Sequence, residues 1–206
     1  MNDIFGKIGK VDPSLCTCHS GGASGSDTVW EESLDRYGGK TRSYSYKTKF
    51  HIGSNKVEIS DEDYQEGIKE VHKANQFMKR HGISKYMNLM ARNWVQVKYS
   101  NQILAIGNLI RIGETNTKGY YNKGKCTVVD GGTGFAVMMG IINQKPVFVF
   151  DQGEEQWYKW SYNVSDYIKM DSSDVYLADQ NFTGIGTRGI NESGVKAIEQ
   201  VLVNSL

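Results

Sequence analysis

The stretch Ser20-Gly-Gly-Ala-Ser-Gly-Ser-Asp27 decides how the rest of the chain is interpreted. It follows residues 15–19, which alternate as a buried strand does. Residues on one helical face come after it: Val29, Trp30, Ser33, Leu34 and Tyr37. The order of strand, glycine-rich turn and helix is the repeating unit of an α/β domain.

A second stretch repeats this order, and a third has the glycine loop and the helix. Lys125-Cys-Thr-Val-Val129 predicts a strand, Asp130-Gly-Gly-Thr-Gly134 a turn, and Phe135–Ile142 a buried helix, because that run is apolar throughout. Ile185-Gly-Thr-Arg-Gly189 is a third glycine loop, and Asn191 then caps a final helix. The chain therefore has three glycine loops, each placed before a helix.

The remaining segments complete an alternating pattern. Further strands are predicted at 42–47, 102–107 and 146–150. Further helices begin at Ser60, a capping residue, and near Lys85. We expect three stretches to lack regular structure: a lead-in at 1–13, a loop at 111–124 and an irregular segment at 152–180.

Continuous apolar strands that alternate with helices indicate a sheet covered on both faces. The sequence thus predicts one three-layer, Rossmann-like α/β domain over residues 1–206, with a mostly parallel central sheet. The carboxyl ends of parallel strands lie at one edge of a sheet, so we expect the glycine loops to meet there.

Composition excludes several classes of protein. The net charge of +1 argues against non-specific nucleic-acid binding, which needs a basic excess. No apolar run reaches the length of a membrane span, and the N-terminus has no signal-peptide pattern, so we expect a cytoplasmic protein without a membrane partner. Cys16, Cys18 and His19 lie in a strand and lack the further ligands of a zinc site. We predict no metal and no cofactor.

The glycine loops carry the predicted chemistry. Glycine lets the backbone adopt positive φ and lets a ligand approach closely. Free amides and the dipole at the start of the following helix attract an anion. The hydroxyl groups of Ser20, Ser24 and Ser26 add donors in the first loop, and that of Thr133 adds one in the second. The predicted ligand-binding residues are Ser20, Gly21, Gly22, Ala23, Ser24, Gly25, Asp27, Asp130, Gly131, Gly132, Thr133, Gly134 and Arg188.

Several residues admit two interpretations. Asp27 either caps its helix or holds a ribose hydroxyl, and Arg188 either pairs with a phosphate or makes a structural ion pair. We expect Arg92 and Lys98 on a helix surface rather than in the site, and Trp94 in the core rather than stacked on a base. The aromatic cluster Trp157–Tyr162 either packs over the sheet edge or contacts a ligand or partner.

The first two loops carry a resemblance. Residues 20–27 resemble the Ser-Gly-Gly-Ala-x-Gly-x-Asp loop of SLOG-superfamily proteins, and residues 130–134 resemble their second glycine motif. The segments 92–107 and 182–188 are similar to uncharacterised bacteriophage and bacterial members. This superfamily includes the Lonely Guy phosphoribohydrolases, the DprA DNA-processing proteins and sensors of ADP-ribose-like messengers. The resemblance spans residues 15–202 and implies a nucleotide or related phosphate at the glycine loops, often in a homo-oligomer.

One position separates binding from catalysis. Lonely Guy enzymes place a catalytic glutamate where this sequence has Met138, which can neither move a proton nor stabilise a positive charge. We therefore predict no catalytic residue, and a protein that binds an ADP-ribose-like or cyclic nucleotide signal, as a phage sponge would. The alternatives are N-glycoside hydrolysis by a displaced carboxylate (Asp27, Asp130, Asp151 or Glu114) and DprA-like binding of single-stranded DNA.

Overall fold

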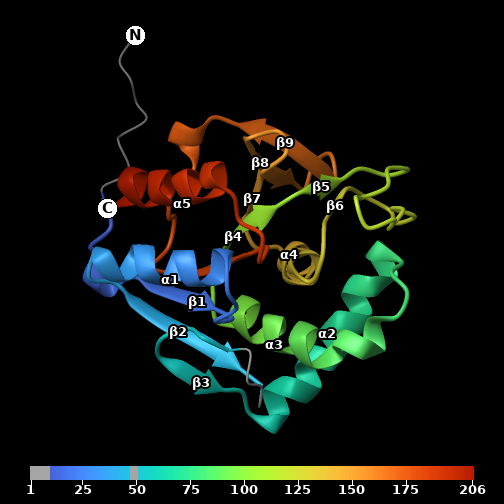
Figure 1. Ribbon diagram of the computed structural model, residues 1–206, viewed down its shortest axis with the longest axis horizontal. Coiled ribbons are helices and arrows are strands. Elements are labelled where there is room, and N and C mark those ends of the chain that lie inside the picture. The colour runs from blue at the N-terminus through green and yellow to red at the C-terminus, as the bar shows by residue number, and fades with distance from the viewer. Residues whose placement is uncertain (1–9, 47–50) are drawn as a thin grey trace.

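An eight-stranded sheet forms the centre of the computed structural model, which describes residues 10–46 and 51–206 (Figure 1). The strand order is β3-β2-β1-β10-β4-β7-β8-β9. The strands from β3 to β7 in this order are parallel, whereas β8 pairs antiparallel with both β7 and β9. Their bounds are β1 Thr17–Ser20, β2 Lys40–Ser45, β3 Lys56–Glu58, β4 Gln102–Gly107, β7 Val147–Asp151, β8 Gln156–Ser161, β9 Asp166–Met170 and β10 Asn181–Gly186. The predicted α/β architecture is confirmed.

Within the described residues, five α-helices cover the sheet on both sides (Figure 1). Helices α1 and α5 pack on one face, and α2, α3 and α4 pack on the other. Both predicted caps are present: the Ser60 side chain accepts from Asp63 N, and the Asn191 side chain accepts from Gly194 N. The helices are α1 Ser26–Arg36, α2 Asp61–Met78, α3 Met87–Lys98, α4 Thr133–Ile142 and α5 Glu192–Ser205.

The central strands are apolar throughout because both faces of the sheet are covered. In β4, Ile103 and Ala105 belong to the core beneath α2, α3 and α4. Leu104 and Ile106 alternate with them and belong to the core beneath α1 and α5. The two cores fix the register of the sheet, since a shift by one residue would exchange the faces.

The predicted irregular segment at 152–180 is wrong in part, because it contains β8 and β9. The turn between β7 and β8 contains Gly153, whereas the turn between β8 and β9 contains neither glycine nor proline. Glu155 and Ser165 take positive φ without being glycine, and Asp151 Oδ1 accepts from the N–H groups of Gly153 and Glu154. The segment 111–124 is irregular apart from one isolated bridge, as predicted.

The predicted strand at 125–129 is also corrected. Only Val128–Val129 forms a strand, β6, and it pairs with β5 (Leu109–Ile110) in a separate two-stranded sheet. The second glycine loop therefore does not follow a strand of the central sheet. Residues 1–9 of the predicted lead-in and residue 47 of the predicted strand 42–47 lie outside the described residues.

Candidate functional site

A cavity of about 370 Å³ opens at the carboxyl edge of the parallel strands. Gly107 and Gly186, the last residues of β4 and β10, lie in its wall. This is where parallel α/β sheets usually hold ligands. The complete lining is Ala23, Asp27, Leu89, Arg92, Asn93, Gly107, Asn108, Lys118, Asp130, Gly131, Gly132, Thr133, Ile185, Gly186, Thr187, Arg188 and Gly189.

All three glycine loops reach this cavity, although they come from distant parts of the chain. Of the predicted ligand-binding residues, the following line it: Ala23, Asp27, Asp130, Gly131, Gly132, Thr133 and Arg188. The others are outside its wall: Ser20, Gly21, Gly22, Ser24, Gly25 and Gly134. The structure thus brings the loops together and separates residues that contact the cavity from residues that shape it.

Hydroxyl groups of the first loop form hydrogen bonds with the protein's own backbone. Ser20 is fully buried, and its hydroxyl donates to Asp27 O and accepts from Gly22 N, both at 3.4 Å. The Ser26 hydroxyl donates to Thr187 O at 2.8 Å. These two hydroxyls, which we expected to face a ligand, are committed to the protein. Ser24 is exposed and lies outside the cavity wall.

Glycines of the first loop make room for other side chains. Gly22 has φ +60, and a Cβ there would overlap the His51 ring, whose Nε2 lies 3.1 Å from Ser43 O. Gly25 has φ +100, and a Cβ there would lie 2.5 Å from Arg188 O, in the third loop. These glycines are therefore required by the packing of the loops.

The second loop presents the start of α4 to the cavity. Gly132 caps the helix, and Thr133 is its first residue. Asn93 of α3 donates to Gly132 O at 3.1 Å, and Arg80 donates to the carbonyl groups of Gly131 and Val129. Gly134 N and Phe135 N donate to Gly131 O and Gly132 O within the turn. The feature of α4 that favours an anion is therefore mainly the positive end of its dipole.

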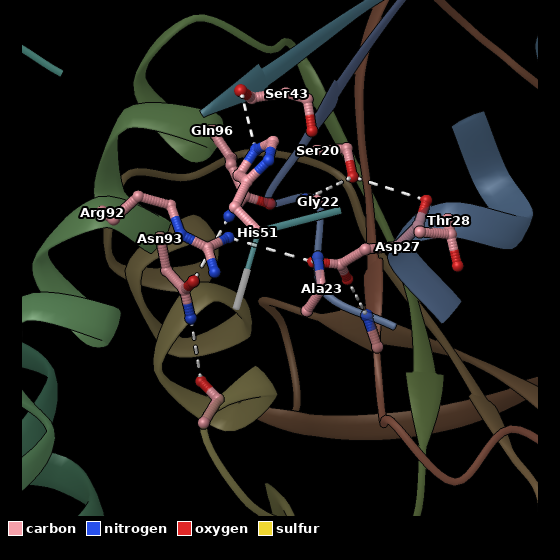
Figure 2. A network of polar contacts seen from close by, with 12 residues as sticks. Ser20, Gly22, Ala23, Asp27, Thr28, Ser43, His51, Arg92, Asn93 and Gln96 are labelled. Atoms are coloured by element: carbon pink, nitrogen blue, oxygen red, sulfur yellow. Dashed lines mark hydrogen bonds and ion pairs between the residues drawn. The ribbon is translucent and has the colours of Figure 1, made fainter. Parts of the chain in front are cut away.

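Arg92 is the residue whose position sequence analysis predicted wrongly. Its side chain is only 5% exposed, and it lines the cavity instead of lying on a helix surface. Its Nη1 lies 3.9 Å from Asp27 Oδ2, beyond hydrogen-bond distance (Figure 2). Among the described residues, its Nε and Nη1 have no hydrogen-bond partner. A buried guanidinium without full pairing is costly unless an anion completes it.

Asp27 joins the first and third loops. Its Oδ1 accepts from Gly186 N at 3.2 Å and its Oδ2 from Ala23 N at 3.4 Å (Figure 2). Burial raises the pKa of Asp27 to about 6, against the lowering effects of Arg92 and these two amides. Burial likewise lowers the pKa of Arg92. The carboxylate thus connects two loops at the cavity wall, and its raised pKa places its protonation near pH 6.

Of the four carboxylates considered for catalysis, two line the cavity and two do not. Asp27 and Asp130 line the cavity. Asp151 is buried elsewhere and accepts from the N–H groups of three residues: Leu109, Gly153 and Glu154. Glu114 accepts from Arg111 N and lies outside the wall. Met138, which the resemblance aligns with the Lonely Guy glutamate, is 2% exposed within the apolar core and does not line the cavity.

The remaining sequence interpretations are resolved by burial. Trp94 is in the core, as expected, and Lys98 pairs with Asp63 and Glu66 at 2.9 and 2.6 Å on the helix surface. Trp157, Tyr158 and Trp160 are buried on β8, so packing accounts for most of the aromatic cluster, while Tyr162 is 45% exposed.

Four features of the described residues bear on metals, cysteine chemistry and membranes. No group of three or more His, Cys, Asp or Glu side chains in the ranges 10–46 and 51–206 is placed to hold a metal ion. Cys16, Cys18 and Cys126 are buried and unpaired.

His19 contacts Tyr44 and Asn181, and burial lowers its pKa to about 4. In the same ranges, no helix has the length and apolar character needed to cross a bilayer.

The cavity residues contributed by α3 and by the segment after β4 were not among the predicted ligand-binding residues. Arg92, Asn93 and Leu89 come from α3, and Asn108 and Lys118 come from the segment 108–129. One signal could have located Arg92. It lies among Met90, Ala91, Trp94 and Val95, a run with apolar residues on more than one helical face, which indicates a helix buried all round.

The sheet, the covering helices and the loops at the carboxyl edge define a Rossmann-like α/β protein with a polar cavity at the usual ligand position. Comparisons with models of protein families, with curated proteins and with solved structures find no match for this chain.

Proposed function

We propose that this protein binds a nucleotide-derived small molecule through its phosphate groups, in the cavity between the glycine loops. The observation that carries the proposal is Arg92, a buried guanidinium whose Nε and Nη1 lack hydrogen-bond partners among the described residues, in the wall of a cavity of about 370 Å³. Gly132 and Thr133, at the start of α4, line the same cavity. A guanidinium group and a helix N-terminus both favour phosphate.

We further propose that the ligand is held intact, as in a sponge that removes an ADP-ribose-like or cyclic nucleotide messenger from a host defence system. The resemblance of residues 20–27 and 130–134 to SLOG proteins supports the nucleotide. The burial of Met138 away from the cavity supports binding without cleavage, because no acid or base stands at that position.

Mass spectrometry of small molecules released by heat from the purified protein tests both parts. An intact phosphate compound containing a nucleobase, released in a near-stoichiometric amount, is the expected result. Release of no phosphate compound, repeated after incubation with a mixture of nucleotides, would contradict the proposal. Release of the free base and the sugar phosphate would replace the sponge with an enzyme.

Asp27 favours a second candidate function, hydrolysis of a nucleotide N-glycoside. Its carboxyl group lines the cavity and its pKa is about 6, which suits a group that gives or takes a proton near neutral pH. In that case water attacks C1′, the C1′–N bond breaks, and the base leaves with a proton. Incubating the protein with nucleoside monophosphates and measuring free base distinguishes the two functions.

A further inference from the structure

The segment 108–129 leaves the central sheet and returns to the cavity. β4 ends at Gly107, and the second glycine loop begins only at Asp130. Between them the short strands β5 and β6 pair antiparallel, with Leu109 opposite Val129. Asp130 N donates to Asn108 O at 2.9 Å, and both residues line the cavity. The segment therefore begins and ends at the site.

The turn within this segment is fixed to the site by Asn116. Its Nδ2 donates to Asp130 Oδ1 at 2.7 Å, and its Oδ1 accepts from Lys118 N at 3.0 Å and Tyr120 N at 2.7 Å. Tyr120 anchors the other side of the turn, since its hydroxyl donates to Met78 O at 3.0 Å. The backbone that carries Lys118 is thus held to the second glycine loop.

Lys118 adds a cation that the cavity's own carboxylates do not neutralise. Asp27 already accepts from two backbone amides, and Asp130 accepts from Asn116 Nδ2 and Gly131 N. Within the described residues, neither Lys118 nor Arg188 has an ion-pair partner within 4.0 Å. Arg92 is buried, whereas Lys118 is exposed, so the two cations lie at different depths of one cavity.

We propose that Lys118 recognises a second phosphate group and makes the site select diphosphate ligands over monophosphates. This inference rests on the proposed function. One phosphate bound at Arg92 and the start of α4 leaves the exposed ammonium group of Lys118 without a partner. A second phosphate linked to the first supplies that partner, and ammonium-to-phosphate hydrogen bonds are among the strong ones. The segment 108–129 is then the part of the chain that sets ligand length.

Calorimetric titration with AMP, ADP, inorganic phosphate and pyrophosphate tests the inference, and the last two probes remove any dependence on the base. Lys118→Met keeps the length of the side chain and removes its charge. Lys123→Met is the matched control, because Lys123 is exposed in the same segment and does not line the cavity. Asn116→Ala is a second variant that leaves Lys118 in place and frees its turn.

Wild-type protein should bind each diphosphate about tenfold more tightly than the matching monophosphate. Lys118→Met should abolish that preference and leave the monophosphate affinities within about twofold, while Lys123→Met keeps the preference. Asn116→Ala should reduce it. Equal losses for mono- and diphosphates in Lys118→Met, or no loss, would overturn this inference alone. If the wild-type protein binds none of the four probes, the proposed function is overturned as well.

Discussion

The guanidinium group of Arg92 lies in the space that a side chain at residue 21 would occupy. A Cβ built on Gly21 would overlap Nη1 of Arg92 and come within 2.8 Å of Nη2. Gly21 is not among the residues with positive φ, so the reason for glycine here is space. The first loop of the site is thus shaped to receive a buried cation from α3.

Gly21→Ala should destabilise the protein only while Arg92 is present. We expect the free energy of unfolding to fall by about 1–3 kcal/mol in the wild-type background, as overpacking does. In an Arg92→Ala background the same change should cost less than about 0.5 kcal/mol, since the two residues couple directly. Urea denaturation of the four proteins measures the coupling. Gly189→Ala is the control, because its nearest neighbour would be 3.9 Å away. An equal loss of unfolding free energy in both backgrounds would show that Arg92 does not lie against residue 21.

Arg92→Met should separate binding from stability. Loss of a charge-assisted contact should weaken ADP binding by roughly tenfold to a hundredfold. The melting temperature should not fall, because the variant removes an incompletely paired buried charge, and Asp27 can take up a proton in response. Arg36→Met, which removes an exposed arginine of α1, should leave ADP affinity unchanged. Unaltered binding in Arg92→Met would exclude this residue from the site.

As the pH falls, two buried groups should change the free energy of unfolding in opposite directions. The raised pKa of Asp27, about 6, means that the folded protein takes up a proton before the unfolded chain does, so acidification from about pH 6 to 4 stabilises the fold. The lowered pKa of His19, about 4, means that the unfolded chain takes up the proton first, so acidification from pH 6.5 to 4 destabilises the fold.

Asp27→Asn removes the group that stabilises the fold on acidification. Between about pH 7 and pH 4.5, the variant should lose on the order of 2 kcal/mol more stability than the wild type does. His19→Asn should shift the balance in the opposite direction. Urea denaturation at both pH values measures the difference. Parallel losses in the wild type and Asp27→Asn would mean that the Asp27 pKa is not raised in the folded state.

Gly132 and Gly22 should respond differently to substitution. A Cβ at Gly132 would meet only Leu89, at 3.5 Å, and its φ of −65 is open to any residue. Gly132→Asp should therefore fold normally and abolish phosphate binding by placing a negative charge at the start of α4. Gly22→Ala should lower stability by about 1 kcal/mol or more, because φ there is +60 and His51 fills the space. Circular dichroism and calorimetric titration of both variants report folding and binding separately.

The architecture was predictable because hydrophobic pattern and loop glycines agree over most of the chain. Apolar runs such as 102–107 and 146–150 indicate strands of a sheet that is covered on both faces. The strands β8 and β9 were missed although Gly153 lies in the turn before β8, because the positive-φ positions of the two turns, Glu155 and Ser165, are residues that rarely adopt that conformation. There, tertiary pairing overrides local preference.

The candidate site was predictable at the level of the loops and not at the level of individual contacts. Sequence spacing identified all three loops, but hydroxyls such as those of Ser20 and Ser26 bond to nearby backbone, a choice that only the packed loops decide. Arg92 and Lys118 reach the cavity through the packing of α3 and the return of the segment 108–129. The apolar residues around Arg92 indicate that it is buried, but which cavity Arg92 and Lys118 reach depends on contacts between segments that are distant in sequence.

A crystal soaked in tungstate tests the central claim most directly, because tungstate resembles phosphate and its anomalous scattering locates it without interpretation of weak density. We predict a peak in the cavity within hydrogen-bond distance of Arg92 and of the N–H groups at the start of α4. A peak should be lost in Arg92→Met crystals soaked in the same way. An empty cavity in the wild type, with tungstate bound only at other surfaces, would contradict the account.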